Sequence, residues 1–163
     1  MTDIDLGAIR AERARLEATY ITQDRPATSA RGIHHAALIC SNVEQTIKFY
    51  QGVLEFPLTE LFGNRDYQGS THFFFDVGNG NLLAFFDFPG LDLAPYRETL
   101  GNINHIAISV TKEKWDYLRA KLAVAGVPYQ EESGASLYFK DPDGVRLELL
   151  ADPLGEMYGT KVL

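Results

Sequence analysis

The feature that most constrains the fold is an internal repeat in the chain. Residues 33–41 (IHHAALICS) return 70 positions later as residues 103–111 (INHIAISVT), each with a histidine at its third position. Towards the ends of the copies the offset shrinks to 64, so that Leu83 matches Leu147. A repeat of this kind predicts two copies of one structural unit, related by a pseudo-twofold axis, with a cleft between them where ligands tend to bind.

Each copy has the same order of predicted elements: a strand, a helix and three short strands. The predicted strands cover residues 33–40, 58–62, 71–77 and 82–88 in the first copy, and residues 104–110, 127–131, 136–140 and 145–150 in the second. A helix follows the N-cap candidate Asn42, and a second helix carries the apolar stripe Trp115, Leu118 and Leu122. The predicted fold class is therefore α+β, with two tandem βαβββ modules that form a curved mixed sheet around the cleft.

A different pattern precedes the repeat. Residues 5–19 predict one amphipathic helix of mixed charge, and the turn-rich stretch TQDRPATSARG predicts a linker after it. A mixed-charge helix favours a solvated face on the domain over a dimer arm or a lid, the alternative. We divide the chain into this helix and linker (1–31), a first module (32–100) and a second module with a C-terminal tail (101–163).

Composition excludes several classes of partner. The 15 Lys and Arg against 22 Asp and Glu give a net charge of −7, which argues against nucleic acid. The longest apolar run, Leu82–Phe86, is too short to span a membrane, and the charged N-terminus is unlike a secretory signal. One cysteine, Cys40, forms no intrachain disulfide and fits a reducing compartment. We expect a cytoplasmic protein whose partner is a small-molecule substrate.

Strand alternation puts three chemistry-bearing side chains on the faces that do not pack on a helix. These are His35 in the first strand, His105 in the fifth and Glu148 in the eighth. Each alone is more simply an ordinary polar strand residue, but the equivalence of the two histidines in the repeat favours a shared role. Two imidazoles and one carboxylate are the ligand set of a divalent ion with open coordination positions. The sequence therefore predicts a metal-binding cleft.

At these residues the sequence resembles the vicinal oxygen chelate superfamily, which includes glyoxalase I, extradiol dioxygenases, methylmalonyl-CoA epimerase and fosfomycin- and bleomycin-resistance proteins. The matching stretches are GIHHAALICSNVEQTIKFYQGVLEF, NHIAISV and LYFKDPDGVRLELL, which together span about Gly32 to Leu150. The resemblance implies metal ligands at His35, His105 and Glu148. It also implies that many such proteins pair their modules across a homodimer. Whether His35 joins the trio within its own chain or from a partner chain stays open.

Departures from the family pattern bear on the subfamily. Ala84 stands at the position of the fourth ligand of glyoxalase I, which argues against that activity and against the epimerase. Ala37 stands where glutathione-dependent fosfomycin-resistance proteins carry Thr. The intact trio argues against a pure bleomycin binder. Tyr138, ten residues before Glu148, matches the spacing of a substrate-facing Tyr of the extradiol dioxygenases.

The resemblance implies an extradiol-type dioxygenase-like enzyme that chelates vicinal oxygens of a small aromatic substrate, with Fe(II) as the favoured metal. Tyr138 and His72 are the candidate catalytic residues, although His72 does not match the position of the family's second-shell His. One alternative uses Zn, Ni or Mn at the same site for isomerase, lyase or thiol-transfer chemistry. Another alternative is a metal-free small-molecule binder.

Overall fold

The computed structural model describes residues 4–21, residue 24 and residues 27–163. The chain separates into two units, Met1–Gly32 and Ile33–Leu163, and each is described by itself. Part of the predicted linker, at residues 22, 23, 25 and 26, lies outside the described residues. Within the described ranges, no helix is long and apolar enough to cross a membrane.

The first unit contains one helix, α1 (Leu6–Tyr20), close to its predicted bounds. Asp5 is its N-cap, because the Asp5 side chain accepts a hydrogen bond of 2.9 Å from the backbone N of Ala8. Arg15 and Glu12 form an ion pair of 2.6 Å one turn apart on the polar side. The sequence therefore located this helix correctly.

The second unit begins with the first module. Its elements are β1 (His35–Ile39), α2 (Val43–Ile47), the π-helical turn η1 (Lys48–Val53), β2 (Leu58–Gly63), β3 (Thr71–Asp76) and β4 (Leu82–Phe86). The strands form a sheet in the order β1-β4-β3-β2, with β1 parallel to β4 and the other pairs antiparallel. The crossover through the helix makes the β1–β4 pair parallel.

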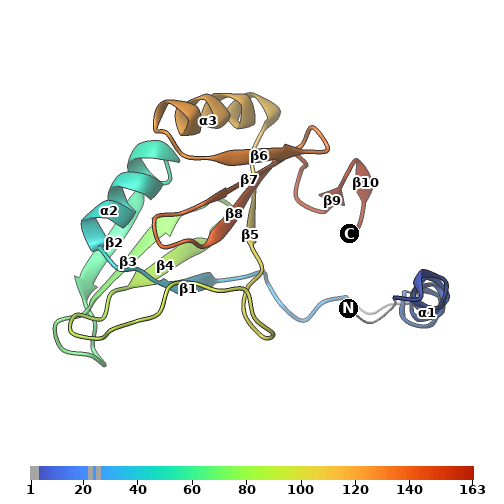
Figure 1. Cartoon of the computed structure of the whole chain (residues 1–163), viewed down its shortest axis with the longest axis horizontal. Coiled ribbons are helices and arrows are strands. Elements are labelled where there is room, and N and C mark those ends of the chain that lie inside the picture. The colour runs from blue at the N-terminus through green and yellow to red at the C-terminus, as the bar shows by residue number, and fades with distance from the viewer. Residues whose placement is uncertain (1–3, 22–23, 25–26) are drawn as a thin grey trace. The chain divides into compact units, whose positions relative to one another are not determined.

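The second module repeats this topology. Its elements are β5 (Ile106–Ser109), α3 (Lys112–Val124), β6 (Tyr129–Glu132), β7 (Ser136–Lys140) and β8 (Arg146–Leu150). The sheet order is β5-β8-β7-β6, with β5 parallel to β8 (Figure 1). The predicted α+β class with two βαβββ modules is confirmed. The strands are hydrogen-bonded in two four-stranded mixed sheets.

Two local features differ from the predicted pattern. The first helix widens into η1 at residue 48, and this turn buries Phe49 and Tyr50. After β8, a short hairpin of β9 (Glu156–Met157) and β10 (Thr160–Lys161) forms in the C-terminal tail, where no strand was predicted. Strands of two residues carry too little periodicity to be recognised from sequence.

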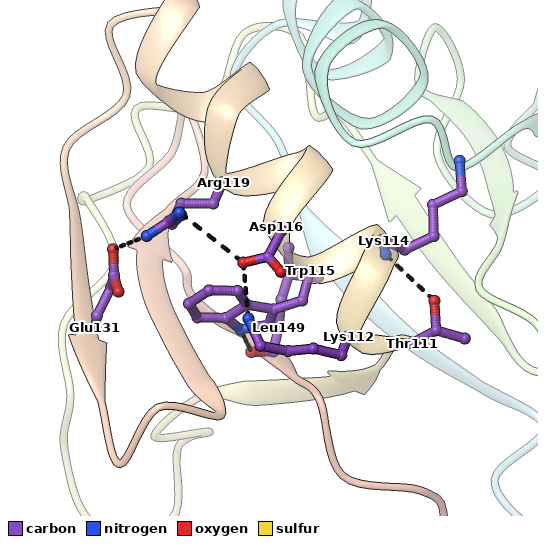
Figure 2. Close-up of polar contacts among 8 residues, drawn as sticks. All are labelled: Thr111, Lys112, Lys114, Trp115, Asp116, Arg119, Glu131 and Leu149. Carbon is purple, nitrogen blue, oxygen red and sulfur yellow. Dashed lines mark hydrogen bonds and ion pairs between the residues drawn. The ribbon is translucent and has the colours of Figure 1, made fainter.

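One hydrophobic core spans both modules. The rings of Phe49 and Phe139, one from each module, lie 6.2 Å apart between centroids. Trp115 of α3 is 2% exposed, and its indole N–H donates to the carbonyl of Leu149 over 3.1 Å (Figure 2). On the outer side of α3, Arg119 contacts Asp116 and Glu131. The apolar face of α3 therefore packs on the core, and its ion pairs lie on the solvent-exposed face.

Polar contacts join the two modules as well. The buried hydroxyl of Tyr50 donates to Asp141 in the turn between β7 and β8 over 3.0 Å. Outside the core, the carboxylate of Glu55 accepts hydrogen bonds from Tyr117 (2.6 Å) and Lys121 (2.9 Å) of α3. These contacts lower the pKa of Glu55 to about 2, with the Tyr117 hydrogen bond as the largest cause and the Lys121 hydrogen bond as the next. The modules therefore form one folded body.

Candidate metal centre

The strand register of the second module brings His105 and Glu148 together. Ala107 of β5 lies beside Glu148 of β8, and His105 directly precedes β5, two residues before Ala107. His105 Nε2 lies 3.1 Å from Glu148 Oε2. Glu148 is only 4% exposed, so burial leaves its carboxylate in need of a cationic or hydrogen-bonding partner. Two of the three predicted ligands therefore face each other.

Asn104 orients the imidazole of His105. The Asn104 side-chain oxygen lies 2.7 Å from His105 Nδ1, and the Asn104 side-chain nitrogen donates to Glu98 over 3.2 Å. An amide oxygen only accepts, so Nδ1 carries the proton and Nε2 is the nitrogen that faces Glu148. Metal-binding histidines are commonly fixed in this way by an acceptor on the other ring nitrogen. The sequence analysis missed Asn104, whose only signal is its place next to a predicted ligand.

Tyr138 completes a cluster with these two residues. It lies directly opposite Glu148 in the antiparallel β7–β8 pair, and its ring meets that of His105 edge-on at 5.5 Å between centroids. Burial, followed by the Glu148 carboxylate, raises the pKa of the Tyr138 phenol. The phenol therefore stays protonated at neutral pH and is available as a hydrogen-bond donor.

His35 lies in the first module, away from this cluster. Its imidazole is exposed on β1, and its ring centroid is 6.1 Å from that of Phe74. Over the described residues, no group of three His, Cys, Asp or Glu side chains within one chain is placed to hold a metal ion. The alternative in which His35 joins His105 and Glu148 within its own chain is thus not what the structure shows. The metal role of the trio stays a prediction.

His34 contacts the predicted ligand His35. In a regular strand over residues 33–40, alternation would put His34 on the face opposite His35, but the Nδ1 atoms of the two rings lie 2.9 Å apart. The observed strand β1 begins only at His35, so residue 34 lies outside the regular alternation. One Nδ1 must donate and the other accept, and this contact orients the His35 ring.

His72, the other candidate catalytic residue, lies on β3 of the first module. Its ring stacks on Phe86 at 3.8 Å between centroids, and its Nε2 is buried with no hydrogen-bond partner in the described part of the chain. Burial, and then the charge of His35, lowers the pKa of His72. Its ring neighbours are Phe62, Phe74 and Phe86 of its own sheet. The structure therefore groups His72 with His35 and not with the His105 cluster.

The registers of the two sheets explain the missing fourth ligand. Ala84 of β4 lies beside Ala37 of β1, as Glu148 of β8 lies beside Ala107 of β5. Ala84 therefore occupies the place in the first module that Glu148 occupies in the second, as the sequence offset indicated. An alanine offers no metal donor, so the predicted ligand set has three members.

Arg146 is a further residue of this face, to which the sequence analysis gave no role. Its guanidinium carbon lies 4.4 Å from the centre of the Tyr138 ring. A separate cavity of about 700 Å³ lies beside the free edge of β1, between residues 93–103 and the turn at residues 142–145. No predicted site residue lines that cavity. The predicted site residues therefore lie outside this cavity.

Comparison with known proteins places this geometry in a family. Residues 32–149 match the model of the Glyoxalase/Bleomycin resistance protein/Dioxygenase superfamily. The putative ring-cleaving dioxygenase MhqA of Bacillus subtilis is 30% identical over 139 residues, which cover 80% of this chain and 43% of that protein. The chain therefore spans less than half the length of that dioxygenase.

Two further proteins also match. Metallothiol transferase FosB of Shouchella clausii is 31% identical over 133 residues, covering 77% of this chain and 83% of that protein. A crystal structure of the fosfomycin resistance protein FosX from Listeria monocytogenes, complexed with Mn(II), has a TM-score of 0.58 and 25% identity, covering 76% of this chain and 94% of that one. The family model spans both βαβββ modules, so the chain belongs to the Glyoxalase/Bleomycin resistance protein/Dioxygenase superfamily.

Proposed function

We propose that the chain is a metal-dependent enzyme of the extradiol dioxygenase type, acting on vicinal oxygens of a small aromatic substrate. The observation that carries this proposal is the His105–Glu148 pair at 3.1 Å with the Tyr138 ring beside it. The likeness to the ring-cleaving dioxygenase supports it, as does the three-donor ligand set. Fe(II) is the favoured metal, because this set leaves open positions for substrate and dioxygen.

The metal site is proposed to form between two copies of the chain. His105 and Glu148 supply an imidazole and a carboxylate, and no third donor joins them among the residues that the structure describes in one chain. His35 stands exposed at the equivalent place on the first module, next to the small residue Ala37. In a symmetric homodimer, His35 of one copy faces His105 and Glu148 of the other, and each dimer has two such sites.

Each residue of the proposed site has a distinct part. Asn104 holds the His105 ring with Nε2 directed at the site, and the buried Glu148 carboxylate supplies negative charge. A divalent ion, when bound, supplies Lewis acidity towards two adjacent substrate oxygens and, in the case of iron, redox chemistry with dioxygen. Tyr138, opposite Glu148 on the neighbouring strand and beside the His105 ring, is placed to donate a hydrogen bond to a substrate oxygen. The Phe74 and Phe86 rings on the opposing module provide an apolar wall for an aromatic substrate.

Complementation tests the shared site. His35→Ala and His105→Ala proteins each lose bound iron, as measured by metal analysis after dialysis. When the two variants are unfolded together and refolded as a mixture, about a quarter of the sites regain all three ligands, because half of the dimers are mixed and each has one intact site. No recovery of iron in the mixture contradicts a site shared between copies.

Oxygen consumption tests the reaction. The iron(II)-loaded protein is expected to consume one dioxygen per catechol and to give a ring-opened product that absorbs in the visible range. The matched control is Glu113→Gln, which removes an exposed carboxylate in the first turn of α3. Iron bound stoichiometrically without oxygen uptake by any diol in a panel contradicts the dioxygenase assignment.

Thiol transfer is the second candidate function. The chain covers 83% of the metallothiol transferase FosB but only 43% of the dioxygenase MhqA, so FosB is the better match in length. Loss of free thiol on incubation with Mn(II), an epoxide and a small thiol, without oxygen uptake, would favour this function. Ligand binding that is indifferent to metal and to His35→Ala would favour a metal-free binder.

A further inference from the structure

The polar face of the second module continues past the predicted ligands to a basic residue. Because Ile106 pairs with Leu147, the residues before them, His105 and Arg146, lie side by side at the same end of β5 and β8. Arg146 also precedes Glu148 by two residues on β8, which puts both side chains on one face, about 7 Å apart along the strand. Arg146 is therefore adjacent to both ligands that the second module supplies.

Arg146 differs from the basic residues of α3 in having no carboxylate partner. The basic groups of α3 are paired: Lys112 with Asp116, Lys114 and Lys121 with Glu55, and Arg119 with Glu131. In the part of the chain that the structure describes, the Arg146 side chain forms neither an ion pair nor a hydrogen bond. It is half-buried and lies over the Tyr138 ring at 4.4 Å. Its neighbour across the sheet is Lys140, a second basic residue without a carboxylate partner among the described residues.

The Tyr138 contact stabilises the position of the guanidinium without using its hydrogen-bond donors. A cation over an aromatic face is attracted by the ring, while the planar N–H groups stay free to bind an oxyanion in a bidentate manner. In a chain with net charge −7, two unpaired cations beside a buried carboxylate create a local site for a negative group. Arginine is the side chain best suited to a carboxylate or phosphonate in such a place.

We propose that Arg146 binds an oxyanion on the substrate, a carboxylate or a phosphonate, while the substrate's vicinal oxygens lie at the metal site. This inference rests on the metal site proposed above and names its substrate class: an anionic compound with two adjacent oxygens. Arg146 and Glu148 are two residues apart on one face of β8, so the anion and the diol would be bound at neighbouring positions along this strand. Arg146 is then a specificity-determining residue, and Tyr138 positions it.

Binding measurements without oxygen test this proposal directly. The iron(II)-loaded protein is titrated by calorimetry with catechol, 3,4-dihydroxybenzoate, 3,4-dihydroxyphenylphosphonate, benzoate and phenylphosphonate. We expect the anionic diols to bind at least tenfold more tightly than catechol. The ratio between the carboxylate and the phosphonate distinguishes the two sources of the oxyanion. In Arg146→Gln the anionic preference falls at least tenfold, and in Arg146→Lys part of it returns, because the charge remains while the fork is lost.

Arg119→Gln is the matched control, since it removes one positive charge from α3 and is expected to keep the wild-type ratio. Circular dichroism and a thermal melt of Arg146→Gln check that the fold is intact. Equal affinities of the wild type for catechol and the anionic diols overturn the proposal, as does an unchanged ratio in Arg146→Gln.

Failure of the proposed function has a different result. If the diols cause no oxygen uptake but benzoate or phenylphosphonate binds and is lost in Arg146→Gln, the oxyanion site stands and the dioxygenase assignment falls. If catechol is cleaved and the anionic preference is absent, the dioxygenase assignment stands and the role of Arg146 falls. Absence of binding by every probe overturns both.

Discussion

The two modules share one topology but present different chemistry on equivalent faces. Phe74 of the first module lies opposite Ala84, where Tyr138 of the second lies opposite Glu148. A histidine begins β1 in the first module and directly precedes β5 in the second, and each imidazole lies near that aromatic ring: His35 at 6.1 Å and His105 at 5.5 Å between centroids. The first module therefore has the histidine among aromatic rings and two further histidines, His34 and His72, and the second has it with a carboxylate and a phenol.

This difference indicates that the duplicated unit supplies positions for metal ligands but not a complete metal site. Strand register determines the positions of the histidine and of its neighbours on the adjacent strands. The residue types at those neighbouring positions determine whether the module supplies metal donors or an apolar surface. Among the described residues, no three potential metal donors come together within one chain. In the proposed shared site, the first module supplies His35 and aromatic rings, and the second supplies His105, Glu148 and Tyr138.

The largest expected effect concerns the core that both modules share. Phe85 and Leu149 are equivalent by the offset of 64, and both are 0% exposed. Phe85→Ala is expected to lower the free energy of unfolding by about 3–5 kcal/mol and Leu149→Ala by about 2–5 kcal/mol, because each leaves a cavity. Chemical denaturation followed by both circular dichroism and tryptophan fluorescence is expected to show one transition. Two separate transitions, with only one shifted by each substitution, would mean that the modules fold independently.

Loss of the carboxylate that distinguishes the second module comes next. Glu148→Gln keeps the size of the side chain but removes the anionic donor, so affinity for iron(II) is expected to fall at least about 100-fold. Competition with a chromogenic chelator measures this affinity, and Glu113→Gln is the exposed control. Unchanged affinity in Glu148→Gln would remove the second module from the metal site.

Much of this comparison was accessible from the sequence. The repeat and the alternation of apolar residues located both modules, because residues such as Leu38, Leu147 and Leu149 must be buried on one face. The equivalence of Ala84 and Glu148 followed from the offset alone. The side-chain contacts could not be predicted in this way. The orientation of His34 and the support of His105 by Asn104 depend on residues just outside strands, where the alternation of apolar and polar residues gives no information.

The packing of the two modules on each other was also beyond sequence pattern. Alternation predicts the face of the sheet on which His35 lies, but it does not predict which surface of the other module, if any, His35 contacts. That depends on how the modules pack, which Tyr50, Asp141 and Glu55 decide through contacts of large sequence separation. With these contacts in place, the described part of the chain does not bring His35 together with His105 and Glu148 as a group that could hold a metal ion.

Breaking a contact between the modules has a smaller effect. Tyr50→Phe removes the buried hydrogen bond to Asp141 and leaves that carboxylate with its backbone donors from Asp143 and Val145. Burial already raises the pKa of Asp141, so the loss is expected to cost about 1–3 kcal/mol. Tyr129→Phe, at an exposed position, is the matched control. A stability equal to wild type would show that the core packing alone joins the modules.

The smallest expected effect is the pH dependence contributed by Glu55. The Tyr117 and Lys121 contacts hold its pKa at about 2 in the folded protein, below the ordinary value of 4.5. A depressed pKa means that the folded state binds fewer protons, so the stabilisation is complete above pH 4.5 and is lost as the pH falls towards 2. Wild type and Glu55→Gln are therefore expected to differ in free energy of unfolding at pH 7 and to converge near pH 2, when measured by urea denaturation across that range. The exposed control Glu113→Gln should follow wild type throughout. A difference for Glu55→Gln that persists unchanged at pH 2 would assign its effect to packing of the side chain, and the ionic contact between the modules would then contribute nothing.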